Sequence, residues 1–238
     1  MACCRLTPYG RREWLGSTAV AVAGVAALAV MAWLMSPWCL LPVVPIVAVW
    51  LWVLWFFRDP DRTPPDEDGT FLSPADGVVA DITNVGPDSE LAADGVKIGI
   101  FMSIFNVHVN RAACDGRVAS VEHRPGAFLD ARQPDASSRN ESATIRLVHR
   151  RGKREYPVVV RQIAGLVARR IITDLAEGQS VRAGERIGMI KFGSRLELLV
   201  PRELAGEVRV ALGDRAVAGQ TVLLAAPQEP GHDATPST

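Results

Sequence analysis

The chain has 238 residues with 26 basic and 26 acidic side chains, which suggests one or two domains with no net formal charge. Its four cysteines show no C-x-x-C spacing and no grouping with the four histidines, which excludes a disulfide framework and a zinc site. We expect neither a bound metal nor a nucleic-acid partner.

A long uncharged stretch lies near the amino terminus. No Asp, Glu, Lys or Arg occurs from residue 14 to residue 57. Two apolar runs fill it, Leu15–Met35 and Cys39–Phe57, and each has the roughly 20 residues that a membrane-spanning helix needs. The sequence therefore predicts a transmembrane helical hairpin over 14–57. Pro42 and Pro45 leave a re-entrant hairpin open.

Basic residues predict the orientation of this hairpin. Arg5, Arg11 and Arg12 precede the first run, Arg58 and Arg62 follow the second, and the link between the runs has none. Basic residues favour the cytoplasmic side of a membrane. We therefore expect a cytoplasmic segment 1–13, and a protein of the inner membrane whose remaining chain faces the cytoplasm.

The rest of the chain divides into three parts. Residues 58–69 are polar and proline-bearing and predict an exposed linker. Residues 70–224 have the size of one domain. Residues 225–238 carry Pro, Ser and Thr and predict a disordered tail.

Short runs rich in Val and Ile, separated by Gly, Asp and Pro, indicate that the domain is mainly β (α+β). The predicted strands are Gly77–Ile82, Val96–Met102, Ala143–Val148, Pro157–Ile163, Arg186–Ile190, Leu196–Val200 and Glu207–Ala211. Ala164–Ile172 is the best candidate for a short helix, and residues 124–142 predict a mobile loop. The glycine-punctuated segment Ala176–Ile190 resembles a lipoyl-like or barrel-sandwich element.

Three short motifs carry candidate chemistry. In "SPADG", Asp76 begins a tight turn and is a candidate acceptor that orients a histidine. His108 alternates with apolar residues and is the best placed of the four histidines for proton transfer near neutral pH. Gly193-Ser194 on its own is a common turn pair.

A serine that follows glycine has a second use. Glycine tolerates a strained backbone and close approach, so the hydroxyl of Ser194 can attack the peptide bond that precedes it. Asp76, His108 and Ser194 then form a triad in which the histidine takes the hydroxyl proton and the carboxylate orients the histidine.

Each motif alone is common, but their combination in this order is characteristic of one protein family. The segments "FFRDPDR", "SPADG", "FMSIFNVHVNRAACDG", "GLVARRI" and the run ending in "AGERIGMIKFGSR" resemble the short prokaryotic form of phosphatidylserine decarboxylase over roughly residues 56–211. Phe105 stands near where many relatives have a second histidine, and Cys114 stands where we would expect proline. A role of that second histidine is therefore not carried over.

The resemblance implies that the chain cleaves itself between Gly193 and Ser194. An ester forms, elimination leaves dehydroalanine, and hydrolysis leaves a covalent pyruvoyl group at position 194 as the cofactor. His108 is implied as the base and Asp76 as its orienter. The pyruvoyl group forms a Schiff base with phosphatidylserine, which loses carbon dioxide and becomes phosphatidylethanolamine.

The same resemblance implies partners. The two chains of one precursor form a heterodimer at a membrane and act in phospholipid biosynthesis, and further oligomerisation stays open. Arginine suits the recognition of phosphate and carboxylate groups. Arg195 and Arg111 are the candidate substrate contacts that we single out from a larger set, which also contains Arg58, Arg62, Arg169 and Arg170.

Three other readings remain. The chain can be a membrane-anchored lipoyl-like binding or scaffold module, which predicts an intact chain. It can be a serine hydrolase that uses Asp76, His108 and Ser194, although no G-x-S-x-G motif surrounds the serine. It can also decarboxylate another phosphoserine-headed lipid, such as archaetidylserine.

Overall fold

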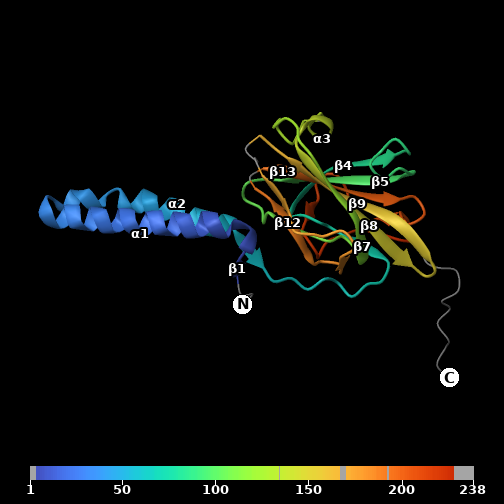
Figure 1. Ribbon diagram of the computed structural model, residues 1–238, viewed down its shortest axis with the longest axis horizontal. Coiled ribbons are helices and arrows are strands. Elements are labelled where there is room, and N and C mark those ends of the chain that lie inside the picture. Colours follow the sequence, from blue (N-terminus) through green and yellow to red (C-terminus); the bar gives the residue numbers. More distant parts are fainter. Residues whose placement is uncertain (1–3, 134, 167–169, 192, 228–238) are drawn as a thin grey trace, which may run out of the picture.

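The computed structural model describes residues 4–133, 135–166, 170–191 and 193–227. Two long helices, α1 (Arg11–Leu34) and α2 (Val43–Phe56), lie side by side and extend away from a β-rich domain (Figure 1). Short 3-10 turns, η1 (Pro8–Gly10) and η2 (Pro37–Leu40), precede them. The Trp50 Nε1 of α2 donates a hydrogen bond to Thr18 Oγ1 of α1 at 3.0 Å.

The helix pair confirms the two predicted apolar helices. Both segments, Pro8–Leu34 and Pro37–Phe56, are long and apolar enough to cross a membrane. Their large side chains point outward; that of Trp33, for example, is 89% exposed. A surface of this kind is stable in lipid and costly in water, so the helix pair indicates membrane association.

An antiparallel sheet of eight strands forms the centre of the β-domain and curls around its core (Figure 1). Its strand order is β11-β7-β8-β9-β13-β5-β4-β15. In chain order the strands are β4 (Gly77–Val85), β5 (Gly95–Met102), β7 (Gly116–Arg124), β8 (Ser142–Arg151), β9 (Arg154–Ala164), β11 (Ser180–Val181), β13 (Ser194–Pro201) and β15 (Arg215–Ala216).

Three smaller sheets and one helical turn complete the domain. One sheet has the order β10-β12-β6, a second β14-β16-β3, and β1 pairs with β2. These strands are β1 (Cys4–Leu6), β2 (Arg58–Pro60), β3 (Thr70–Leu72), β6 (Val109–Arg111), β10 (Ile171–Thr173), β12 (Arg186–Ile190), β14 (Glu207–Val208) and β16 (Val222–Ala225), and the helical turn is α3 (Ala136–Arg139).

The apolar core lies between the long sheet and the small sheets. Alternate residues of β5 and β13, among them Ile98, Ile100 and Leu196, are fully buried in it. Phe71 of β3 and Ile187 of β12 close it from the other side. Alternation with a period of two is what places one face of each strand in this core.

Six of the seven predicted strands are present, of Glu207–Ala211 only Glu207–Val208 is a strand, and the domain is mainly β as expected. The helix predicted over Ala164–Ile172 is wrong in its described part, because Ala164 ends β9 and Ile171 begins β10. Ile171 and Ile172 are β-branched and favour a strand over a helix, and they lie in β10. Residues 167–169, including Arg169, lie outside the described residues.

The structure also bears on the segment Ala176–Ile190, the connector and the tail. The lipoyl-like interpretation of Ala176–Ile190 is not confirmed, because β11 and β12 belong to different sheets. The connector 58–69 is not uniformly exposed, since Asp59 of β2 is only 2% exposed. The predicted tail begins inside β16 at Ala225, and its residues 228–238 lie outside the described residues.

Candidate active site

The predicted cleavage point lies where β12 leads into β13. Gly193 has a φ of +48°, a left-handed conformation that favours glycine. Ser194 is fully buried and is paired with Met102 of β5 on one side and Ala164 of β9 on the other. A Cβ added at Gly165 would lie 2.1 Å from the Gly193 carbonyl oxygen, so only glycine at 165 lets that carbonyl pack so closely.

His108 is a fully buried histidine just before β6. Its Nδ1 lies 2.9 Å from the carbonyl oxygen of Asn106. A carbonyl oxygen only accepts, so Nδ1 carries the proton and Nε2 presents its lone pair. Nε2 is buried and has no hydrogen-bond partner among the described residues.

The surroundings of His108 keep it neutral. Burial is the main cause that lowers its pKa to about 4, and the positive charge of Arg58 adds to this effect. The hydrogen bond to Asn106 and the negative charge of Asp76 oppose it. The ring of Phe56, the last residue of α2, covers the imidazole with its centroid 4.5 Å away. The arrangement provides an unprotonated base at neutral pH.

A buried chain of polar side chains approaches Ser194 from β6. The Ser194 hydroxyl donates to the Met102 sulfur at 3.4 Å, and Asn110 Nδ2 donates to the same sulfur at 3.8 Å. Gln162 Nε2 donates to Asn110 Oδ1, and Thr173 Oγ1 donates to Gln162 Oε1, both at 2.8 Å. Asn110 of β6 lies two residues after His108, so this network runs from the segment next to His108 to Ser194.

Asp76 lies near His108 but does not touch it. Its carboxylate accepts two hydrogen bonds from Arg62, at 2.5 and 2.8 Å, and one from the backbone N–H of Ala218 at 2.8 Å. The backbone N–H of Arg111 donates to Pro74 O and holds this turn beside β6. The expected Asp76–His108 hydrogen bond is therefore not made, and the carboxylate acts on His108 through its charge.

Arg195 and Arg111 are occupied by partners within the domain. Arg195 is 7% exposed and pairs with Asp81 and with Glu197. Arg111 is 4% exposed and donates to Asp59 Oδ1 at 3.1 Å and to Gly184 O at 2.9 Å. Neither guanidinium is presented to a ligand, so we do not carry these two expected substrate contacts forward.

The other candidate arginines have different positions. Arg62 is held by Asp76. Arg58 lies 3.7 Å from the centroid of the Trp55 ring and donates to the carbonyl oxygen of Phe105 at 2.9 Å, which ties α2 to the loop before His108. Arg170 is exposed at the edge of β10.

The sequence reading missed Gly165, Met102, Asn110 and Gln162. One signal was available, because Asn110 follows His108 by two residues and so shares its strand face. Gln162 is the one side-chain amide of β9 and follows the apolar run Val158–Val160, which is a second signal. No three His, Cys, Asp or Glu side chains of the described ranges lie close enough together to hold a metal ion.

Comparisons with known proteins identify a family. Residues 50–224 match the family described as phosphatidylserine decarboxylase. A phosphatidylserine decarboxylase proenzyme of Paramagnetospirillum magneticum is 49% identical over 175 residues, which cover 72% of this chain and 71% of that protein.

Two further proteins with the same name are similar. That of Zymomonas mobilis is 44% identical over 73% of this chain and 76% of its own length. That of Geotalea uraniireducens is 42% identical over 86% of this chain and 91% of its own length. The match spans the helix end, the β-domain and every site residue described above, and the chain therefore belongs to the phosphatidylserine decarboxylase family.

Proposed function

We propose that the chain is a membrane-bound proenzyme that cleaves itself between Gly193 and Ser194 and then converts phosphatidylserine to phosphatidylethanolamine. The observation that carries this proposal is the buried, neutral His108 with its unpartnered Nε2. A buried nitrogen without a hydrogen-bond partner is costly, and such groups concentrate at functional sites.

The first step uses only groups of the chain. The Ser194 hydroxyl oxygen attacks the Gly193 carbonyl carbon while Nε2 of His108 takes the hydroxyl proton. The C–N bond breaks, the proton passes to the Ser194 nitrogen, and an ester joins the two residues. Loss of the Ser194 α-proton expels the Gly193 carboxylate, and water then releases ammonia.

The site fits the pyruvoyl group that this sequence of steps leaves. Its carbons come from Ser194, which is already buried beside Met102. The unpartnered Nε2 of His108 can accept or return a proton. When present, the pyruvoyl group supplies an electron sink for decarboxylation. Ser194 then holds the group at the start of β13, and His108 is the candidate to move protons there.

The sheet explains how the two products of cleavage stay together. β13 begins at Ser194 and lies between β5 and β9, which both belong to the chain ending at Gly193. Its neighbours hold it through two antiparallel ladders, and β16 pairs in the same way with β3. These contacts support a stable heterodimer without a disulfide.

The helix pair supports a position at the membrane. The substrate is a lipid, and α2 ends at Phe56 directly on His108. Anchoring holds the site at the depth of the head groups and raises the encounter rate. With the basic residues that flank the helices, we propose the inner membrane with the β-domain on the cytoplasmic side.

The direct test is conversion of phosphatidylserine vesicles by the purified protein. We expect phosphatidylethanolamine from the wild-type protein and from Ser180→Ala, which changes an exposed serine of β11. We expect none from Ser194→Ala, which stays one chain. Product formation by an uncleaved Ser194→Ala chain contradicts the proposal.

A further inference from the structure

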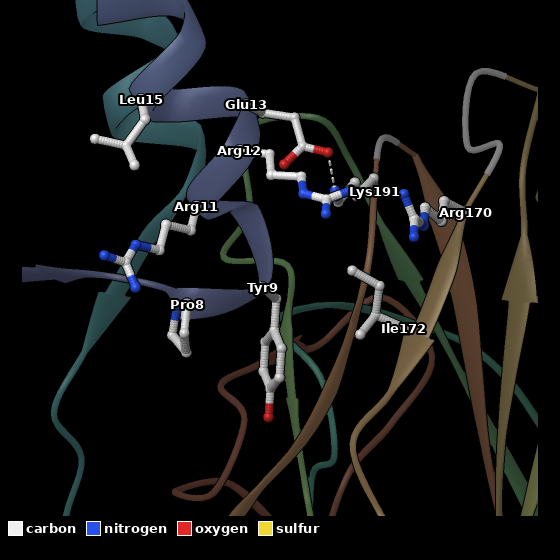
Figure 2. A pocket seen from close by; sticks show the side chains of 9 residues that line it. All are labelled: Pro8, Tyr9, Arg11, Arg12, Glu13, Leu15, Arg170, Ile172 and Lys191. Atoms are coloured by element: carbon white, nitrogen blue, oxygen red, sulfur yellow. Dashed lines mark hydrogen bonds and ion pairs between the residues drawn. The ribbon is translucent and has the colours of Figure 1, made fainter.

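A cavity of about 420 Å³ lies where the start of α1 meets the edge formed by β10 and β12 (Figure 2). Its walls include Arg11, Arg12 and Leu15 of α1, Arg170 beside β10, and Lys191 after β12. None of these side chains takes part in the cleavage chemistry described above. The cavity is lined by the first residues of α1, and the start of α1 lies where the helix pair meets the β-domain (Figure 1).

The walls carry an excess of positive charge. Four basic side chains and one acidic side chain, Glu13, line the cavity, and Glu13 pairs with Lys191. Arg12 and Arg170 extend toward this pair in Figure 2, whereas Arg11 points to the other side. Arg12 and Arg170 are exposed and have no ion-pair partner in the ranges that the structure describes. The cavity therefore offers free guanidinium groups to an anion.

An apolar surface lies farther along the same face of α1. Val22, Ala26 and Ala29 follow Leu15 by 7, 11 and 14 residues and so lie on the same face of α1. These three line a second, apolar cavity of about 360 Å³ against Val47 and Trp50 of α2. Leu15 to Ala29 spans roughly 20 Å of helix, which is enough to cover the roughly 15 Å hydrocarbon layer of one leaflet.

We infer that this surface binds an anionic phospholipid, with its phosphate between Arg12 and Arg170 and an acyl chain along α1. Arginine pairs with phosphate through two parallel hydrogen bonds, and basic side chains at a membrane surface attract anionic lipids. The inference rests on the proposed membrane position of the helix pair, but not on self-cleavage or decarboxylation. The lipid is either the substrate or another anionic lipid of the same leaflet.

Native mass spectrometry of the full-length Ser194→Ala protein tests this inference without catalysis. The protein in detergent is mixed with phosphatidylserine, phosphatidylglycerol or phosphatidylcholine, and retained lipids are counted. The test variant adds Arg12→Gln and Arg170→Gln. The matched control adds Arg5→Gln and Arg117→Gln, which remove the same charge from exposed arginines that do not line the cavity.

We expect anionic lipid to bind in preference to phosphatidylcholine, with affinity reduced at least about tenfold in the test variant and unchanged in the control. If the test variant loses binding of phosphatidylserine alone, the occupant is the substrate. If it loses binding of both phosphatidylserine and phosphatidylglycerol, the site accepts anionic lipids in general. Equal retention by test and control variants, or equal retention of phosphatidylcholine, overturns the inference. If the double variant aggregates, lipid retention by the single variants Arg170→Gln and Arg117→Gln is compared instead, with the same expected difference.

Discussion

At the scale of residues, the site contains two buried groups, one that can accept a proton and one that can donate it. His108 has a lone pair with no partner, while the Ser194 hydroxyl donates to the sulfur of Met102. A thioether is a weak acceptor and cannot serve as a base. We therefore place proton transfer on His108 and regard the Met102 contact as the resting position of the hydroxyl.

A pair of substitutions separates these two roles. His108→Gln keeps a polar side chain but removes the base, so we expect self-cleavage to slow by about 10²–10⁴-fold. Met102→Leu conserves volume at a cost of less than about 1.5 kcal/mol, and we expect cleavage of the same order of magnitude as wild type. Gel analysis of freshly translated precursor measures both rates. Slow cleavage in Met102→Leu with normal cleavage in His108→Gln would reverse the assignment.

The low pKa of His108 predicts a pH profile for self-cleavage. The folded protein holds the imidazole neutral down to about pH 4, whereas an unfolded histidine titrates near 6.5. We expect a constant cleavage rate at neutral pH that falls by half near pH 4. A midpoint at 6.5 or above would show that His108 is not held neutral by burial.

The same shift has a consequence for stability. Between pH 6.5 and about 4 the unfolded chain binds a proton at position 108 that the folded chain does not. The contribution of His108 to stability is therefore complete above pH 6.5 and declines as the pH falls toward 4. Urea unfolding of His108→Gln across this range, which should lack the decline, provides the comparison.

At the scale of elements, the short strand β2 joins the helices to the β-domain. Asp59 in its centre is almost fully buried and accepts from Arg111 at 3.1 Å and from Arg186 at 2.6 Å. Burial lowers the pKa of Arg111, and Asp59 opposes this shift. An uncompensated buried arginine is costly, so we regard Asp59 as the main electrostatic attachment of β2.

Two aspartates of this segment provide a matched test. Asp59→Asn leaves Arg111 without its buried partner, and we expect a loss of about 3–5 kcal/mol in the free energy of unfolding. Asp61→Asn removes a second partner of Arg186, but its side chain is 53% exposed, so the loss should be under about 1 kcal/mol. Urea unfolding of the protein in detergent measures both. Equal losses would contradict the role of Asp59.

The elements also show what sequence patterns can and cannot predict. Short apolar runs such as Leu196–Val200 predicted strands correctly, because such runs suit a central strand that is buried on both faces, as β13 is. β7 was missed, since six of its nine residues are charged or small and its apolar positions are few. Partners distant in sequence were not predictable. Asp76 lies on Arg62 because the fold brings the two together.

At the scale of the whole molecule, the helix pair and the β-domain form one working unit. Phe56 covers His108, Glu13 pairs with Lys191, and Trp14 packs near Phe57 and Met189. The membrane helices therefore contribute walls to the region of the active site. The sequence indicated that the hairpin anchors the enzyme, but not that Phe56 of α2 packs on the ring of His108.

The orientation of this unit can be tested by protease protection. We expect protease added to spheroplasts to leave the β-domain intact, because the proposed location is the cytoplasmic side. Inverted membrane vesicles should lose it, since their cytoplasmic face is outward. Antibody detection of the carboxyl-terminal chain reports both results. Digestion in spheroplasts and protection in inverted vesicles would place the domain on the opposite side.

The most direct test of the central claim is the intact mass of the purified protein. Self-cleavage predicts two masses, of which the smaller begins at position 194 and is lighter than its serine-started sequence by one ammonia. Ser194→Ala should give the single mass of the 238-residue chain. A single full-length mass for the wild-type protein, with decarboxylase activity intact, would contradict the claim that a pyruvoyl group from Ser194 carries the reaction.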